Sequence, residues 1–143
     1  MEIKEIAPSE AYEILKNKNS ALIDVRTDAE QIFVGQADLS NCLGKSFLIP
    51  WKVFPSMAVN PRFQLSLEKG LKNAFSNTDI HDLDVIFICR SGSRSFEAAM
   101  YMSQLGFKNC YNLTSGFEGG TNTNGHRSSI DGWKAENLPW RQQ

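Results

Sequence analysis

The chain alternates short apolar runs with segments of helical periodicity, and this alternation is the strongest constraint on its fold. Four runs have the length and composition of strands buried on both faces: 21–25 (ALIDV), 46–51 (SFLIPW), 85–89 (VIFIC) and 110–114 (CYNLT). A weaker strand candidate is IKEI near the start. Because strands that alternate with helices are joined by right-handed crossovers, the pattern predicts an α/β fold with a central, mostly parallel five-stranded sheet flanked by helices.

Three segments carry the helical spacing, at 9–17 (SEAYEILKN), 66–75 (SLEKGLKNAF) and 93–106 (SRSFEAAMYMSQLG). The face of the third helix that we expect to be buried comprises Phe96, Ala99, Met100 and Met102 or Ser103. Ser93 or Ser95 is the expected cap of this helix, and Gly106 is the expected stop. Helix thus follows strand along most of the chain.

Length and composition suit a single globular domain. The chain has 143 residues, so we expect 1–143 to form one domain, with a Gly-rich extension at about 115–143. A formal net charge of -1 lacks the basic excess of nucleic-acid-binding proteins. The start, MEIKEIAPSE, is too charged for a signal peptide, and no apolar run approaches the ~18 residues of a membrane span. We therefore expect a cytoplasmic protein with no nucleic-acid or membrane partner.

The cysteines argue against a disulfide framework. Cys42, Cys89 and Cys110 are odd in number and include no C-x-x-C pair, so neither paired disulfides nor a cysteine zinc site is predicted. At least one thiol should be free. Cys110 opens a predicted strand and is expected in the core.

Cys89 ends an apolar run and stands directly before a turn and a helix. The residues that follow it are Arg90, Ser91, Gly92, Ser93, Arg94 and Ser95. In parallel α/β folds, ligands bind beyond the carboxyl ends of the strands. Gly92 permits a left-handed backbone that turns N–H groups inward, and the helix N-terminus adds partial positive charge. Arg90 and Arg94 add two full charges, so the turn favours an anion, and with it the thiolate of Cys89.

A buried structural role is the alternative for Cys89. Cysteine that closes an apolar strand is commonly a small hydrophobe of the core. Charged residues would not ordinarily follow such a cysteine at once, since buried charges are costly without partners. The loop sequence therefore favours a reactive thiolate in an anion-binding turn.

Three motifs in order resemble the rhodanese family of sulfurtransferases: ALIDVRTDAE (21–30), CRSGSRS (89–95) and MYMSQLGFKNCYNLTSGFEG (100–119). The resemblance extends from about Ile6 to Trp140. It implies the three-layer rhodanese-like fold and a Cys89 that accepts sulfur as a persulfide, held by the loop at 90–95. Asp24 and Arg26 would support the site from a neighbouring strand.

The same resemblance implies a reaction. A small anionic donor such as thiosulfate would give its outer sulfur to Cys89, and cyanide, a thiol or a protein acceptor would remove it. No metal or organic cofactor is implied. Many family members carry a Gly-His-Ile-Pro-Gly-Ala stretch after the first motif, where this chain has FVGQADLSNCLGK (33–45) and only Gly35 matches.

Two other functions remain open at this point. Phosphatases and arsenate reductases of the Cys-loop type have similar loops, but those phosphatases use C-x-x-x-x-x-R, whereas Cys89 and Arg94 form the one-residue-shorter C-x-x-x-x-R. A tighter ring should suit one sulfur atom better than a tetrahedral oxyanion. A regulatory rhodanese module without turnover is the other alternative, although such a module would not need Cys89.

Several residues outside the loop have lesser candidate roles. His126, in the Gly-rich extension, would be a proton donor if it lies at the site, although a lone loop histidine is usually solvated. Cys42 would be a resolving thiol if it approaches Cys89. The aromatic candidates are Trp133 and Trp140 as anchors of the tail, and Trp51 and Phe54 as lining of the pocket mouth.

Overall fold

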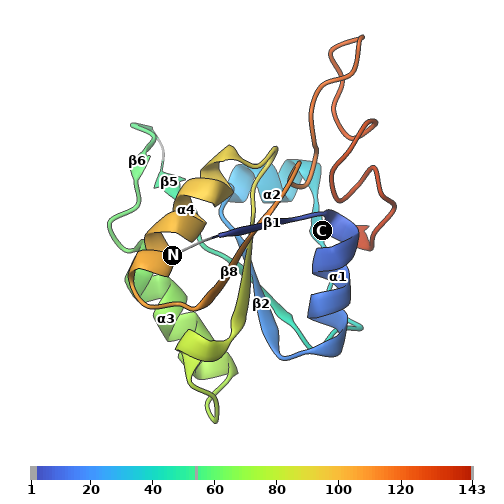
Figure 1. The fold of residues 1–143 in the computed structure, drawn as a ribbon. Coiled ribbons are helices and arrows are strands. Elements are labelled where there is room, and N and C mark those ends of the chain that lie inside the picture. Colours follow the sequence, from blue (N-terminus) through green and yellow to red (C-terminus); the bar gives the residue numbers. More distant parts are fainter. Residues whose placement is uncertain (1–2, 54, 143) are drawn as a thin grey trace.

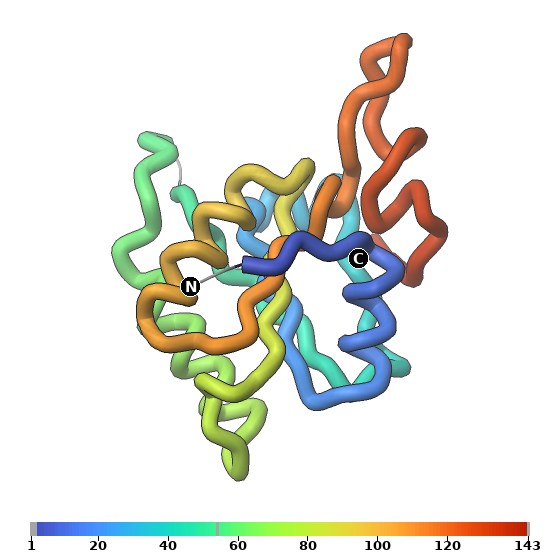
Figure 2. The backbone as a smooth tube through the Cα atoms, in the orientation of Figure 1, coloured from blue at the N-terminus to red at the C-terminus, as the bar shows by residue number. Residues whose placement is uncertain are grey.

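A five-stranded parallel sheet forms the centre of the molecule in the computed structural model, which describes residues 3–53 and 55–142 (Figures 1 and 2). The strands are β1 (Lys4–Ile6), β2 (Ser20–Asp24), β4 (Lys45–Leu48), β7 (Asp84–Ile88) and β8 (Asn109–Leu113). They are ordered β1-β8-β7-β2-β4, and each neighbouring pair is parallel. The predicted central parallel sheet is confirmed.

Helices cover both faces of this sheet and give the predicted three layers. α1 (Pro8–Asn17) lies on one face, whereas α3 (Phe63–Ala74) and α4 (Ser93–Gln104) lie on the other (Figure 1). The short helix α2 (Asp28–Val34) follows β2 and has no buried residue, so the apolar periodicity of the sequence did not reveal it. A 3₁₀ turn, η1 (Ile80–Asp82), precedes β7.

Two short antiparallel pairs lie outside the main sheet. β3 (Gln36–Ala37) pairs with β9 (Trp140–Arg141), which ties the end of the chain to the segment after α2. β5 (Lys52–Val53) pairs with β6 (Ala58–Val59). Each is too short to produce a readable period-2 pattern, so neither pair was predicted from the sequence.

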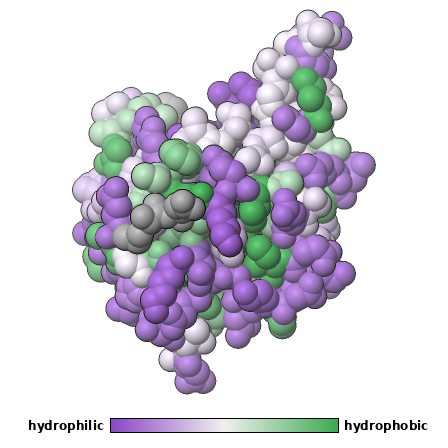
Figure 3. All heavy atoms as spheres, viewed as in Figure 1, coloured by the Kyte–Doolittle hydropathy of each residue, from purple (hydrophilic) through white to green (hydrophobic). Residues whose placement is uncertain are grey.

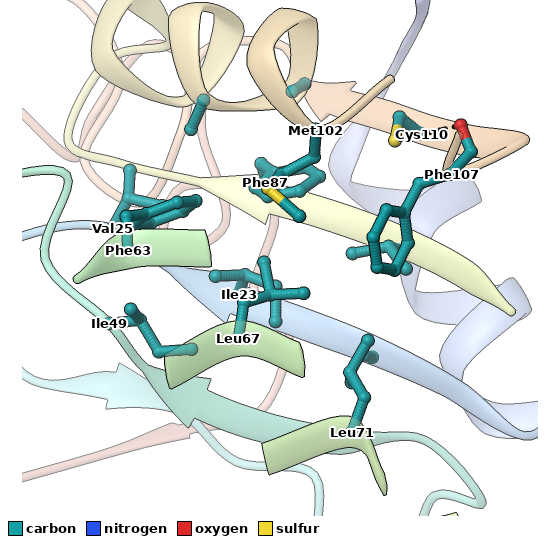
Figure 4. Close-up of a cluster of buried hydrophobic side chains, with 14 of the residues drawn as sticks. Ile23, Val25, Ile49, Phe63, Leu67, Leu71, Phe87, Met102, Phe107 and Cys110 are labelled. Atoms are coloured by element: carbon teal, nitrogen blue, oxygen red, sulfur yellow. Dashed lines mark hydrogen bonds between the residues drawn. The ribbon is translucent and has the colours of Figure 1, made fainter. Parts of the chain in front are cut away.

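The core is divided by the sheet into two apolar layers. Ala21 and Ile23 of β2 pack with α3 and α4, where Leu67 and Met102 meet them, and Figure 4 shows this cluster. Leu22, between them, faces α1 and the C-terminal segment instead. Because both faces of the central strands are covered, these strands read as continuous apolar runs.

The face of α4 differs from the prediction. Its buried residues are Ser95, Ala98, Ala99, Met102 and Ser103, whereas Phe96 is 40% exposed. Small side chains let the helix approach the sheet closely, which a phenylalanine on that face would prevent. The predicted serine cap was also wrong, because Gly92 is the N-cap residue. The predicted stop is confirmed, since Gly106 has a φ of 96° just past the helix.

The surface is mainly hydrophilic on the face drawn in Figure 3, where hydrophobic residues form small separate groups. Within 3–53 and 55–142, no helix is long and apolar enough to cross a membrane.

Leu67 provides a test of the packing. Its side chain is fully buried between α3 and the sheet, so Leu67→Ala should reduce the free energy of unfolding by roughly 2–5 kcal/mol. Leu65, on the same helix, is 65% exposed, and Leu65→Ala should cost well under about 1 kcal/mol. Urea unfolding monitored by circular dichroism measures both values. Equal losses in the two variants would contradict the assigned helix face.

Candidate active site

The sulfur of Cys89 lies at the carboxyl end of β7, near the middle of the sheet. Cys89 directly follows β7, whose neighbours are β2 and β8, and the residue is only 1% exposed. The Gly92 N–H donates to Cys89 Sγ at 3.1 Å, and the Ser95 hydroxyl lies 3.3 Å from the same sulfur. The chain thus turns back over the sulfur, and the Gly92 N–H is directed at it.

Gly92 makes this turn possible. Its φ of 116° and ψ of -13° fall in a region that residues with a Cβ rarely adopt, and α4 begins at the next residue. The first N–H groups of a helix have no intrahelical acceptor and carry partial positive charge. A sulfur anion at Cys89 would therefore lie in a favourable field.

The turn after β8 holds the backbone of the loop from behind. The N–H of Phe117 donates to the carbonyl of Cys89 at 2.8 Å, and the N–H of Glu118 donates to the carbonyl of Arg90 at 3.0 Å. Gly116 packs so closely that a Cβ there would lie 2.5 Å from the Cys89 carbonyl oxygen. These contacts satisfy the loop carbonyls on one side and leave its N–H groups free to face the sulfur.

Asp24 and Arg26 form a buried ion pair beside the loop. Arg26 Nε and Nη2 donate to the two carboxylate oxygens of Asp24 at 2.9 and 2.7 Å, and Nη2 also donates to the carbonyl of Gly35 at 2.8 Å. The guanidinium lies 4.5 Å from the ring centre of Phe117. The pair therefore connects β2, the end of α2 and the turn behind Cys89, and its hydrogen bonds go to these segments rather than to the sulfur.

Arg94 turns its guanidinium to α2 instead of to the sulfur. It donates to both carboxylate oxygens of Glu30, at 2.7 and 2.9 Å. Burial raises the pKa of Glu30, but the hydrogen bonds from Arg94 and Thr27 outweigh it and lower the pKa to about 2. The Thr27 hydroxyl and the Glu30 carboxylate also form a capping box at the start of α2. Arg94 is thus a largely compensated cation.

Arg90 is exposed at the mouth of the loop. Among the described residues its guanidinium has no carboxylate partner. A pocket of about 410 Å³ lies here, lined by Thr27, Ala29, Glu30, Met57, Arg90 and Arg94. Arg90 is the cation that an anion entering this pocket would meet.

The structure does not bring Trp51 to the pocket mouth, so that prediction was wrong. Trp51 is 6% exposed, packs edge-on against Phe63 and donates from its indole nitrogen to Glu97. An aromatic residue in an apolar stretch fills the core more readily than a wet rim. Phe54 lies outside the described residues. Trp133 is fully buried, as expected for an anchor of the tail.

Cys42 and Cys89 lie beyond opposite ends of the parallel strands. Cys42 precedes the parallel strand β4, whereas Cys89 follows β7, so roughly 15 Å of strand separates their ends. Cys42 cannot act as a resolving thiol for Cys89 in this fold. Burial raises the pKa of the Cys42 thiol, and it raises the pKa of Cys110, in the core, to about 12.

His126 is exposed on the Gly-rich extension and does not line the pocket beside Arg90. Its backbone is hydrogen-bonded to Asn122 within the same extension. No group of three His, Cys, Asp or Glu residues in the described ranges is placed to hold a metal ion.

Comparison with known proteins identifies the family. The model of the rhodanese-like domain family matches residues 7–123. The chain belongs to the rhodanese-like family. Its relatives include the uncharacterized protein RP600 homolog of Rickettsia rickettsii, which is 36% identical over 145 residues, or 99% of each chain.

Solved structures agree with this assignment. The crystal structure of Rv0390 from M. tuberculosis shares 35% identity and a TM-score of 0.83, with 100% of both chains covered. A polysulfide-sulfur transferase homodimer from Wolinella succinogenes has the same fold, with 22% identity and a TM-score of 0.64 over 99% of this chain and 80% of that one. The rhodanese-like fold predicted from the motifs is confirmed.

Some residues of the site escaped the sequence analysis. Glu30 was readable in principle, because Thr27 and Glu30 have the spacing of a capping box. Asn112 had a weaker signal, as a polar residue within a buried strand that must have hydrogen-bond partners. Gly116 had none, since only the tertiary contact with Cys89 gives it a role.

The ion pair of Glu30 and Arg94 predicts a pH dependence of stability. Because the folded protein lowers the pKa of Glu30 from 4.5 to about 2, the pair stabilises the fold above pH 4.5 and loses this contribution as the pH falls toward 2. Wild type should exceed Glu30→Gln in unfolding free energy at pH 7 by on the order of 1–3 kcal/mol, and the difference should shrink between pH 4.5 and pH 2.

Urea unfolding of both proteins at pH 7, 5, 4 and 3 measures this difference. Glu136 is a suitable control, because it is exposed and has no side-chain hydrogen bond among the contacts of the described residues. Glu136→Gln should give a small difference that hardly changes with pH. A difference for Glu30→Gln that persists undiminished to pH 3 would show that the pair does not stabilise the fold.

Proposed function

We propose that the protein is a sulfurtransferase that carries sulfane sulfur as a persulfide on Cys89. The observation that carries this proposal is the Cys89 sulfur under its turn, with the Gly92 N–H at 3.1 Å and the start of α4 directly behind it. Such a turn stabilises negative charge on sulfur without a metal or organic cofactor.

Loading begins with the thiolate of Cys89. It attacks the outer sulfur of a donor such as thiosulfate, so that a bond forms between Cys89 Sγ and that sulfur. The sulfur–sulfur bond of the donor breaks, and sulfite leaves with its electron pair. The negative charge now rests on the terminal sulfur of the persulfide, which the N–H groups of the loop can hold.

In the discharge step, Cys89 is the leaving group instead of the nucleophile. A nucleophile such as cyanide or a thiolate attacks the terminal sulfur, the bond between the two sulfurs breaks, and Cys89 leaves as a thiolate. Cyanide becomes thiocyanate, and a thiolate becomes a persulfide. Charge and electrons balance in both steps, and no external oxidant or reductant is needed.

The charges at the pocket suit a small anionic donor. Arg90 provides an exposed cation at the mouth of the loop, and guanidinium groups bind oxyanions well through their planar fork. The pocket of about 410 Å³ has room for a sulfur donor larger than thiosulfate or for the end of an acceptor. A thiol or a protein is the acceptor class we propose.

The arrangement of Arg94 argues against phosphatase chemistry. A phosphoryl oxyanion needs a guanidinium directed into the loop, whereas both donor arms of Arg94 are taken by Glu30. The spacing from Cys89 to Arg94 is also one residue shorter than in Cys-loop phosphatases. A regulatory module without turnover would have no use for the donors aimed at Cys89.

Intact-mass measurement after incubation with thiosulfate tests the proposal. Wild type should gain one sulfur atom and should convert thiosulfate and cyanide to thiocyanate. Cys89→Ser should lose both, because it lacks the thiolate, with activity reduced at least about 10³-fold. Cys110→Ser should retain both, since Cys110 lies in the core and burial raises its pKa to about 12.

Two results would overturn the proposal. One is sulfur uptake that persists in Cys89→Ser. The other is Cys89-dependent hydrolysis of an aryl phosphate by the wild type at a rate comparable with its thiocyanate formation.

A further inference from the structure

The hydroxyl of Ser95 faces more acceptors than it can serve. Its oxygen lies 3.3 Å from Cys89 Sγ, 3.2 Å from the carbonyl oxygen of Gly92 and 2.5 Å from Oδ1 of Asn112. A serine hydroxyl has one hydrogen and can donate to one of these groups at a time. The side chain is fully buried, so water does not compete for that hydrogen.

Asn112 has its amide orientation fixed by neighbours. Its Nδ2 donates to the Glu5 carboxylate at 2.7 Å and to the Gly92 carbonyl at 3.1 Å. Both partners accept hydrogen bonds only, so the amide nitrogen must face them and Oδ1 must face Ser95. Two oxygens at 2.5 Å need a hydrogen between them, and the Ser95 hydroxyl supplies it.

We propose that Asn112 is a positioning residue that competes with Cys89 for the Ser95 hydroxyl. The hydroxyl then acts as a switch that changes its acceptor with the charge on Cys89. While Sγ is neutral, as a thiol or as the bridging sulfur of a persulfide, Ser95 donates to Asn112. When Sγ becomes a thiolate, the hydroxyl rotates and donates to the sulfur. Both acceptors are already within reach of the same oxygen, so the change needs only rotation of the hydroxyl and a slight separation of the Ser95 and Asn112 oxygens, which no longer share a hydrogen.

The persulfide part of this inference rests on the proposed function. In the discharge step the bond between the two sulfurs breaks and Cys89 Sγ takes the electron pair. The Ser95 hydroxyl can turn to the sulfur as this charge develops, which stabilises the departing thiolate. In the loaded state the buried hydroxyl keeps Asn112 as its acceptor, so neither state leaves it without a partner.

The wild type and the Ser95, Asn112 and Asn109 variants have the same charged groups around the sulfur, and only the Glu5 variants differ. These charged groups come from the loop, α4, α2, β2 and β1, and they are Arg90, Arg94, Glu30, Asp24, Arg26 and Glu5. A change at Ser95 or Asn112 alters a hydrogen bond to sulfur but adds or removes no charge.

The pH midpoint of Cys89 alkylation by iodoacetamide, read by mass spectrometry of the Cys89 peptide, measures the switch. Ser95→Ala removes a donor to the thiolate and should raise the midpoint by about one pH unit, or tenfold in the ionisation equilibrium. Asn112→Ala removes the nearer of the two competing acceptors, leaving only the Gly92 carbonyl oxygen at 3.2 Å, and should lower the midpoint by roughly half a unit. In the Ser95→Ala background, Asn112→Ala should have no further effect.

Two additional comparisons separate this role from a merely structural one. Glu5 is exposed, so its variants should fold. Glu5→Ala should lower the midpoint, as Asn112→Ala does. Glu5→Gln keeps an acceptor oxygen and should return the midpoint to the wild-type value. Asn109 lies on the same strand and donates to the Asp82 carbonyl instead, so Asn109→Ala should leave the midpoint unchanged.

The proposal fails if Asn112→Ala raises the midpoint, or if it shifts the midpoint equally with and without Ser95. Alkylation requires no sulfur transfer, so the two proposals can fail separately. If the alkylation midpoints shift as expected but the protein takes up no sulfur, the proposed function is refuted and the hydroxyl switch stands. Unmoved midpoints in a protein that transfers sulfur would refute the switch alone.

Discussion

The site depends on the hydrogen bonds that the carbonyls of Cys89 and Arg90 accept from the turn after β8. A peptide loop can present its N–H groups to a sulfur atom only if its carbonyls point elsewhere and find donors there. The N–H groups of Phe117 and Glu118 are those donors, and the absence of a side chain at Gly116 lets the two loops meet. The loop around Cys89 is therefore shaped by the turn after the neighbouring strand.

The hydrogen-bond donors at the sulfur are the Gly92 N–H and the Ser95 hydroxyl, whereas Arg94 donates to Glu30. Glu30 compensates the charge of Arg94, and the same carboxylate caps α2, so the pair fixes the position of that helix beside the pocket. Arg26 is compensated by Asp24 and supports the turn through the Phe117 ring. What remains for a sulfur anion is the Gly92 N–H, the start of α4 and the Ser95 hydroxyl, with Arg90 farther out at the mouth.

Sequence alone predicted what depends on local pattern. The runs around Ile23 and Phe87 predicted the sheet because strands covered on both faces are continuously apolar, and the position of Cys89 at the end of one run predicted where its sulfur lies. Prediction from the sequence failed where a side chain could have taken either of two environments. Nothing local shows that Arg94 pairs with a glutamate far along the chain, or that Trp51 packs into the core.

A crystal structure of the protein after treatment with thiosulfate would show whether the turn after Cys89 holds a sulfur anion. We expect one added sulfur at about 2.05 Å from Cys89 Sγ, with its free end directed at the N–H groups of the loop and the first turn of α4. An added sulfur that points away from these N–H groups, or that lies on Cys42 while Cys89 stays unmodified, would contradict it.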